Sequence, residues 1–130
     1  MALGKIKADT LEHSTAGSVD TQFAVKGSVK SSINFNGQNV VSIRDSLNVS
    51  SLTDNASGRY QINNSTNFGN ANYSITGSTG YYTSGTDGAN MSLSNGAANM
   101  STSVYGIETD TDSTDTDHTL NCTQAVGDLA

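Results

Sequence analysis

The densest group of reactive side chains is a run of five carboxylates within residues 108–117. Glu108, Asp110 and Asp112 alternate with uncharged residues, so an extended backbone would place three carboxylates on one face. Clustered carboxylate oxygens are the ligands of hard cations such as calcium. The spacing lacks the glycine and the last glutamate of a calcium loop, however, because counted from Asp110 an aspartate and an asparagine stand there. We therefore interpret residues 108–117 as a solvated acidic loop, with a divalent-cation site as the alternative.

The other groups that could do chemistry are two histidines and one cysteine. His13 and His118 are too far apart in sequence to form a short metal-binding motif, although a trimer could gather three copies of either one on its axis. Cys122 is alone, which excludes an intrachain disulfide and a multi-cysteine zinc site. The chain has no nucleophile elbow, no glycine-rich phosphate loop and no tryptophan for a sugar-binding groove. We expect no catalytic residue, no cofactor and no metal, and hence no enzyme.

A pair of tyrosines stands within residues 77–88, among glycine, serine and threonine. Binding loops use this composition, because a tyrosine gives amphipathic contact area with few rotors and small polar neighbours adapt to the partner. The surface-recognition candidates are Tyr81, Tyr82, Thr83 and Ser84. We expect an exposed loop here; in the alternative interpretation, the tyrosines pack over the edge of the fold.

The composition limits what can position these groups. Ser, Thr, Asn and Gly supply 62 of the 130 residues, whereas Leu, Ile, Val and Phe supply 24, so the hydrophobic core must be thin. A formal net charge of -6 argues against nucleic-acid binding. No apolar run is long enough for membrane insertion, and no secretory signal is visible at the start of the sequence.

Apolar residues recur with a period of two along nearly the whole chain, which is typical of β-strands. The pattern predicts an all-β fold, an antiparallel β-sandwich or small jelly-roll-like barrel of about 7–9 short strands. The expected strands lie around residues 19–25, 29–35, 41–49, 59–63, 73–76, 91–93, 100–104 and 120–126, with tight-turn signals at residues 36–37 and 95–96.

The first fifteen residues precede this pattern, and we expect them to be an N-terminal docking arm followed by a single β domain over residues 16–130. The docking candidates are Lys5, Ile6 and Lys7, an isoleucine between two bases. Residues 1–59 hold all six bases and five of the acids, whereas residues 60–130 hold seven acids and no base. This division suits head-to-tail or platform docking, and selection for solubility alone is the alternative. Because the core is thin, we expect a homo-oligomer, with a trimer as its state.

Four stretches carry a resemblance to a known group of proteins: Lys7 to Gln22, Ile43 to Asn55, Gly58 to Ile62 and Ala71 to Tyr73. Together they resemble a module of virion structural proteins, of the tail fibre-like or capsid decoration kind, from marine cyanophages and related bacteriophages. The resemblance implies a non-enzymatic place on the virion surface, with other virion proteins of the capsid or tail as partners.

Three functions follow as expectations. The first is a small capsid decoration or knob protein that docks through its N-terminal arm, because a short chain with few residues before its first strand fits that role. The second is a tail fibre-associated module for host attachment, with a host surface glycan as a possible ligand. The third is a carbohydrate-binding module, which would require export.

Overall fold

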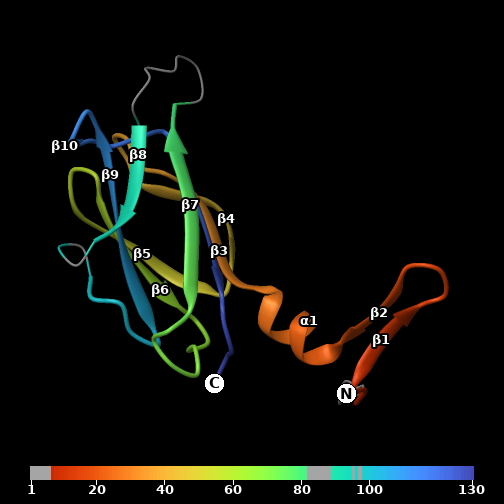
Figure 1. The fold of residues 1–130 in the computed structure, drawn as a ribbon. Coiled ribbons are helices and arrows are strands. Elements are labelled where there is room, and N and C mark those ends of the chain that lie inside the picture. The colour runs from red at the N-terminus through yellow and green to blue at the C-terminus, as the bar shows by residue number, and fades with distance from the viewer. Residues whose placement is uncertain (1–6, 82–88, 95, 97) are drawn as a thin grey trace.

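The computed structural model describes residues 7–81, 89–94, 96 and 98–130. Within them, two antiparallel sheets face each other and form a β-sandwich, which confirms the expected fold class (Figure 1). In chain order the elements are β1 (Thr10–His13), β2 (Gly17–Asp20), α1 (Thr21–Gly27), β3 (Val29–Asn36), β4 (Ser42–Leu47), β5 (Val49–Ala56), β6 (Arg59–Asn64), β7 (Ser74–Gly80), β8 (Ala89–Leu93), β9 (Val104–Thr111), β10 (Thr114–Asp115) and β11 (Leu120–Val126).

The first sheet has the order β4-β3-β11-β7. In the second sheet β5 pairs with β6 and β6 with β9, while β8 and β10 also pair with β9. The chain crosses from the first sheet to the second between β4 and β5, where Asn48 has a φ of 57°. This positive φ turns the backbone sharply, so one expected strand over residues 41–49 is in fact two strands in different sheets.

The core lies between the sheets and is built mainly from residues of β3, β6, β9 and β11, with Phe68 and Tyr73 added from the connection between β6 and β7. The buried apolar side chains are Ile33, Phe35, Tyr60, Ile62, Phe68, Tyr73, Tyr105, Ile107 and Ala125. Phe35 meets Tyr60 edge to face at 4.9 Å, and Phe68 stacks on Tyr73 at 3.9 Å between ring centroids. Burial raises the pKa of Tyr73 to about 12. Aromatic rings thus supply much of the burial that the few aliphatic residues cannot.

Residues 19–25 do not form the expected strand. Val19 pairs with Leu11 in the short hairpin β1–β2, and the chain then continues as α1. The alternation of Phe23 and Val25 is overridden because no neighbouring strand pairs with them, and the local sequence with Gln22, Ala24 and Lys26 favours a helix. The two larger sheets therefore begin at β3 and β5, and the expected boundary at residues 15 and 16 falls inside the β1–β2 hairpin.

The acidic segment 108–117 is not the expected loop. Its first part belongs to β9 and residues 114–115 form β10, so the segment is a β-hairpin. Strand geometry is possible because the outer face of the sheet is solvated and Arg59 pairs with Glu108 across the strands. The next strand prediction is also too early, since residues 100–103 lie outside any strand and β9 begins at Val104.

Candidate functional site: the N-terminal extension

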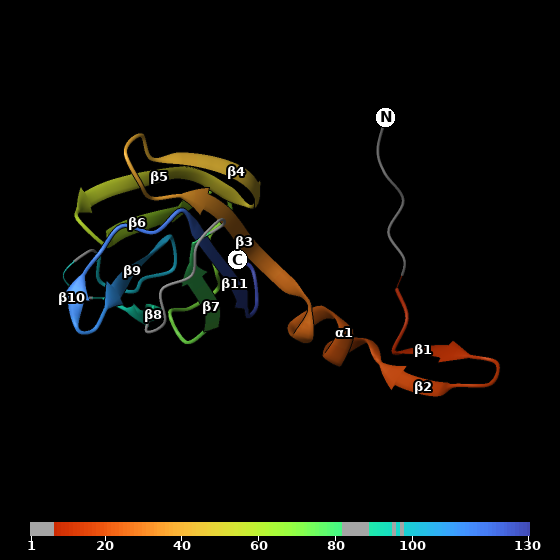
Figure 2. The same ribbon diagram turned by 90° about the horizontal axis from the view of Figure 1, so that it is seen from above.

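Residues 7–28, called the extension below, lie outside both larger sheets. They consist of the β1–β2 hairpin and α1, and they lead away from the sandwich (Figure 2). Every residue of the extension is exposed except Thr21, which is partly buried. The rest of the described chain therefore covers almost none of its surface.

Four large apolar side chains of the extension are left in water. Leu11, Val19, Phe23 and Val25 are between 43% and 63% exposed. Leu11 and Val19 are paired across the hairpin and so share one of its faces. Scattered apolar residues are ordinary on a surface, but four within 22 residues, each about half exposed, are a concentration of uncovered apolar area.

The secondary structure of the extension has little internal support. Its strands have four residues each and its helix has seven, and elements of this size are marginal in water without a surface to pack on. Two hydrogen bonds tie the helix to the start of the hairpin: Thr21 N donates to the Asp9 carbonyl at 2.8 Å, and the Thr21 hydroxyl donates to the Ala8 carbonyl at 2.6 Å. These bonds set the angle between hairpin and helix.

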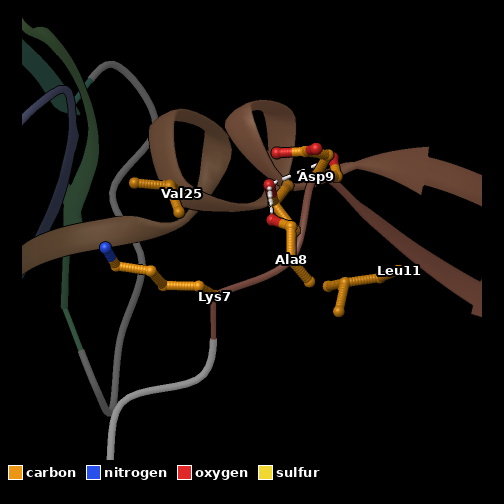
Figure 3. Close-up of a pocket in the computed structure, with 6 residues that line it drawn as sticks. Lys7, Ala8, Asp9, Leu11 and Val25 are labelled. Carbon is orange, nitrogen blue, oxygen red and sulfur yellow. Dashed lines mark hydrogen bonds between the residues drawn. The ribbon is translucent and has the colours of Figure 1, made fainter.

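A hollow of about 670 Å³ opens at this junction (Figure 3). Leu11 from β1 and Val25 from α1 supply apolar walls, and Lys7 and Asp9 supply charge beside them. Thr21 and Ala8 complete the lining. A concave surface with apolar walls and a charged rim suits a side chain or chain segment of another protein, and holds no arrangement of groups for bond-breaking chemistry.

Of the three docking candidates, Lys7 is exposed and lines this hollow. Lys5 and Ile6 lie outside the described residues. The expected arm of residues 1–15 included Leu11, but Val19, Phe23 and Val25 were not expected to be exposed in the extension, because residues 19–25 were assigned to a strand of the sandwich.

Of the recognition candidates, the structure describes Tyr81, which lies away from the extension. Tyr81 directly follows β7 and is half-buried, and its ring meets the ring of His118 edge to face at 4.9 Å. Tyr82, Thr83 and Ser84 lie outside the described residues. The predicted exposed loop over 77–88 starts too early, since residues 77–80 belong to β7.

His118 is completely buried, which its sequence context did not indicate. Its Nε2 lies 3.0 Å from the Thr111 hydroxyl, and its Nδ1 has no hydrogen-bond partner among the described residues. Burial lowers the pKa of His118, while the nearby carboxylates of Asp110 and Asp117 act in the opposite direction. The ring is therefore held neutral against Tyr81.

Asp117, next to it, joins several elements. One carboxylate oxygen accepts a hydrogen bond from the Gly58 amide and another from the Tyr60 hydroxyl, both at 2.6 Å. The backbone carbonyl of Asp117 accepts a bond from the Gln38 side chain at 3.2 Å. Desolvation and this carboxylate raise the pKa of Tyr60. Asp117 is structural, because its carboxylate fixes the β5–β6 turn and its backbone carbonyl holds the β3–β4 connection.

Two other carboxylates of the acidic segment share one base. Arg59 Nε lies 3.0 Å from Glu108 and 2.9 Å from Asp115, and the Ser94 hydroxyl donates to the same Glu108 oxygen. No group of three or more metal-ligating side chains occurs among the described residues. The described carboxylates thus serve the hairpin and its neighbours rather than gathering around one point.

Comparison with protein families, curated proteins and solved structures finds no match to this chain. Among residues 7–81, 89–94, 96 and 98–130, no helix has the length and apolar character needed to cross a membrane. The function is therefore argued from the geometry of the extension and the sandwich.

Proposed function

We propose that this chain is a non-enzymatic surface protein of a virus particle, which docks through its N-terminal extension and displays the β-sandwich. The observation that carries the proposal is the exposure of the whole extension, with four large apolar side chains that the described chain leaves uncovered. Only contact with another protein would repay the ordering of this segment. The sequence resemblance to phage virion modules supports the choice of a particle as the docking partner.

A capsid decoration or knob protein is the first form of this proposal. A displayed sandwich with a serine- and threonine-rich surface and a net charge of -6 would keep particles apart in solution. The extension supplies a single attachment point, as a small protein repeated over a capsid needs.

Host attachment at a tail fibre is the second form, and one observation favours it. Tyr81 is held by His118 at one end of β7, where the chain passes toward Tyr82, Thr83 and Ser84. An aromatic ring held in place by a neighbouring ring is a usual contact for a sugar. A carbohydrate-binding module outside a virion is the third hypothesis, and the same contact between Tyr81 and His118 supports it.

Quantitative mass spectrometry of purified particles separates these roles. The decoration role predicts dozens to hundreds of copies per particle, and the tail role predicts a few to a few tens. Absence of the chain from particles would contradict both virion roles and leave the carbohydrate-binding module.

The docking role is tested by a double variant, Leu11→Asp with Val25→Asp, produced during infection in place of the normal chain. Charges on the apolar walls of the hollow should remove the protein from particles, while the sandwich melts normally. Leu93→Asp is the matched control, since Leu93 is 55% exposed on β8. Unchanged incorporation of the double variant would reject the extension as the docking element.

A further inference from the structure

The exposed large apolar side chains are not spread evenly over the molecule. Nine occur among the described residues, and two of them, Leu93 and Leu129, are isolated. Four belong to the extension, and three belong to the β3–β4 hairpin, namely Val40, Ile43 and Leu47. The exposed apolar side chains thus gather in two parts of the chain. Within β4 they lie on both faces, because Ile43 pairs with the inward-facing Phe35 whereas Leu47 pairs with Ser32 on the outer face.

β4 is the more exposed part of this hairpin. It lies at the end of its sheet, with β3 on one side, and all six of its residues are exposed. Val40, which precedes it, is 78% exposed, the highest value among the large apolar residues described. An edge strand also presents backbone amides and carbonyls on its outer side, so it can accept a further strand.

The extension has the chemistry and the size to cover this edge. Its β1–β2 hairpin can continue a sheet, and its hollow has apolar walls for side chains such as Val40 or Leu47. The extension comprises 22 residues, and a standard protein interface uses about 20–30 residues on each side.

Charge is complementary as well. The extension carries three carboxylates, Asp9, Glu12 and Asp20, against Lys7 and Lys26, so its net charge is -1. Residues 29–47 carry Lys30 and Arg44 against one carboxylate. Opposite net charge favours correct encounter and orientation of the two surfaces.

We propose that the extension of one copy covers the β4 edge of a second copy of this chain. The inference rests on the proposed docking role of the extension and names a neighbouring copy, itself part of the particle, as the surface on which the extension docks. Each copy has one extension and one β4 edge, so the contact is head-to-tail. A pair of copies still has one unused extension and one unused β4 edge, to which further copies can bind. A closed ring satisfies every surface, and a trimer is the small ring expected for this chain. In the chain itself the extension points away from the sandwich, so its own β4 stays uncovered (Figure 2).

A complementation experiment tests this geometry with purified full-length protein and light scattering. The first variant carries Leu11→Asp and Val25→Asp on the extension, and the second carries Val40→Asp and Leu47→Asp at the β4 edge. Unaltered protein should form a closed oligomer at micromolar concentration, and each variant alone should be a monomer. A one-to-one mixture should give dimers and nothing larger, because one intact extension meets one intact edge.

The control Leu93→Asp should keep the full oligomer. Circular dichroism and melting of each variant show whether the sandwich is folded. If a double variant is unfolded, it is replaced by a variant that keeps only one of its two substitutions. A monomeric unaltered chain, an oligomer that survives the β4 substitutions, or a mixture that stays monomeric would overturn the inference. The proposed function has its own test, because it is wrong if the extension variant still enters particles. If the chain is a monomer but its extension is needed for incorporation into particles, this inference is wrong and the proposed function stands.

Discussion

We expect the stability of this protein to depend on pH, because His118 is fully buried. The folded state lowers the pKa of His118 because its ring is removed from water and its Nδ1 has no described partner. The unfolded chain has a histidine pKa of about 6.5 and binds the proton more readily. Unfolding therefore takes up a proton in mild acid, and stability falls as pH drops below that value.

We predict that the free energy of unfolding decreases between pH 7 and pH 5.5, and that His118→Gln removes most of this decrease. The amide keeps a polar partner for the Thr111 hydroxyl. Urea titrations at several pH values measure the effect, with His13→Gln as control because His13 is exposed. NMR titration of the two histidine rings in the unaltered chain gives a direct check. A His118 ring that titrates at or above the value for His13 would contradict the prediction.

The Tyr60 hydroxyl is the second residue-scale test. Tyr60→Phe removes one of the two hydrogen bonds that the side chain of Asp117 accepts, and leaves the carboxylate with the Gly58 amide. Loss of a hydrogen bond to a charged group should lower the free energy of unfolding by about 1–3 kcal/mol. The denaturant midpoint measures this loss. A change below about 0.5 kcal/mol would mean that Asp117 does not depend on Tyr60.

At the scale of elements, alternation predicts a strand where its apolar side chains meet a covered face. Ile33 and Phe35 in β3, and Tyr60 and Ile62 in β6, are buried as their spacing requires. The same alternation fails at Phe23 and Val25, because strand formation needs a neighbouring strand that local sequence does not reveal.

The opposite error occurs at residues 108–117, where strands form although no apolar alternation marks them. Inward positions of β9 include Thr109, which is buried and donates to the Thr116 carbonyl at 2.7 Å, so polar residues do the work of apolar ones there. The candidate site was predicted only at Lys7 and Tyr81 among the described residues. The burial of His118 and the apolar surface of the extension depend on contacts between distant segments, which spacing does not encode.

The β5–β6 turn gives an element-scale prediction. Gly58 has a φ of +67°, and a Cβ there would overlap the Thr109 carbonyl oxygen and lie 2.7 Å from the Thr116 amide nitrogen. Gly58→Ala should lower the free energy of unfolding by at least about 2 kcal/mol. Gly69→Ala is the control, because the nearest heavy atom to its Cβ would be 3.6 Å away, and its effect should stay within about 0.5 kcal/mol. Equal melting temperatures for the two variants would contradict this account of the turn.

At the scale of the whole molecule, a sandwich with a thin core carries an extension that it does not cover. The sandwich closes its interior with aromatic rings and hydrogen-bonded polar side chains, whereas the extension leaves apolar surface in water. This contrast separates a part with its own buried core from a part that, in our proposal, is covered by another protein. We expect residues 7–28 to become ordered when the protein assembles, and not in the isolated chain.

Hydrogen exchange followed by mass spectrometry tests that claim most directly. The chain is compared as a dilute monomer and in its assembled state, on particles or as the oligomer. The account predicts that backbone amides of residues 10–27 exchange without measurable protection in the monomer and slow by at least about tenfold on assembly, while β3, β6 and β11 are protected in both. Full protection of the extension in the monomer, or no gain of protection on assembly, would contradict the account.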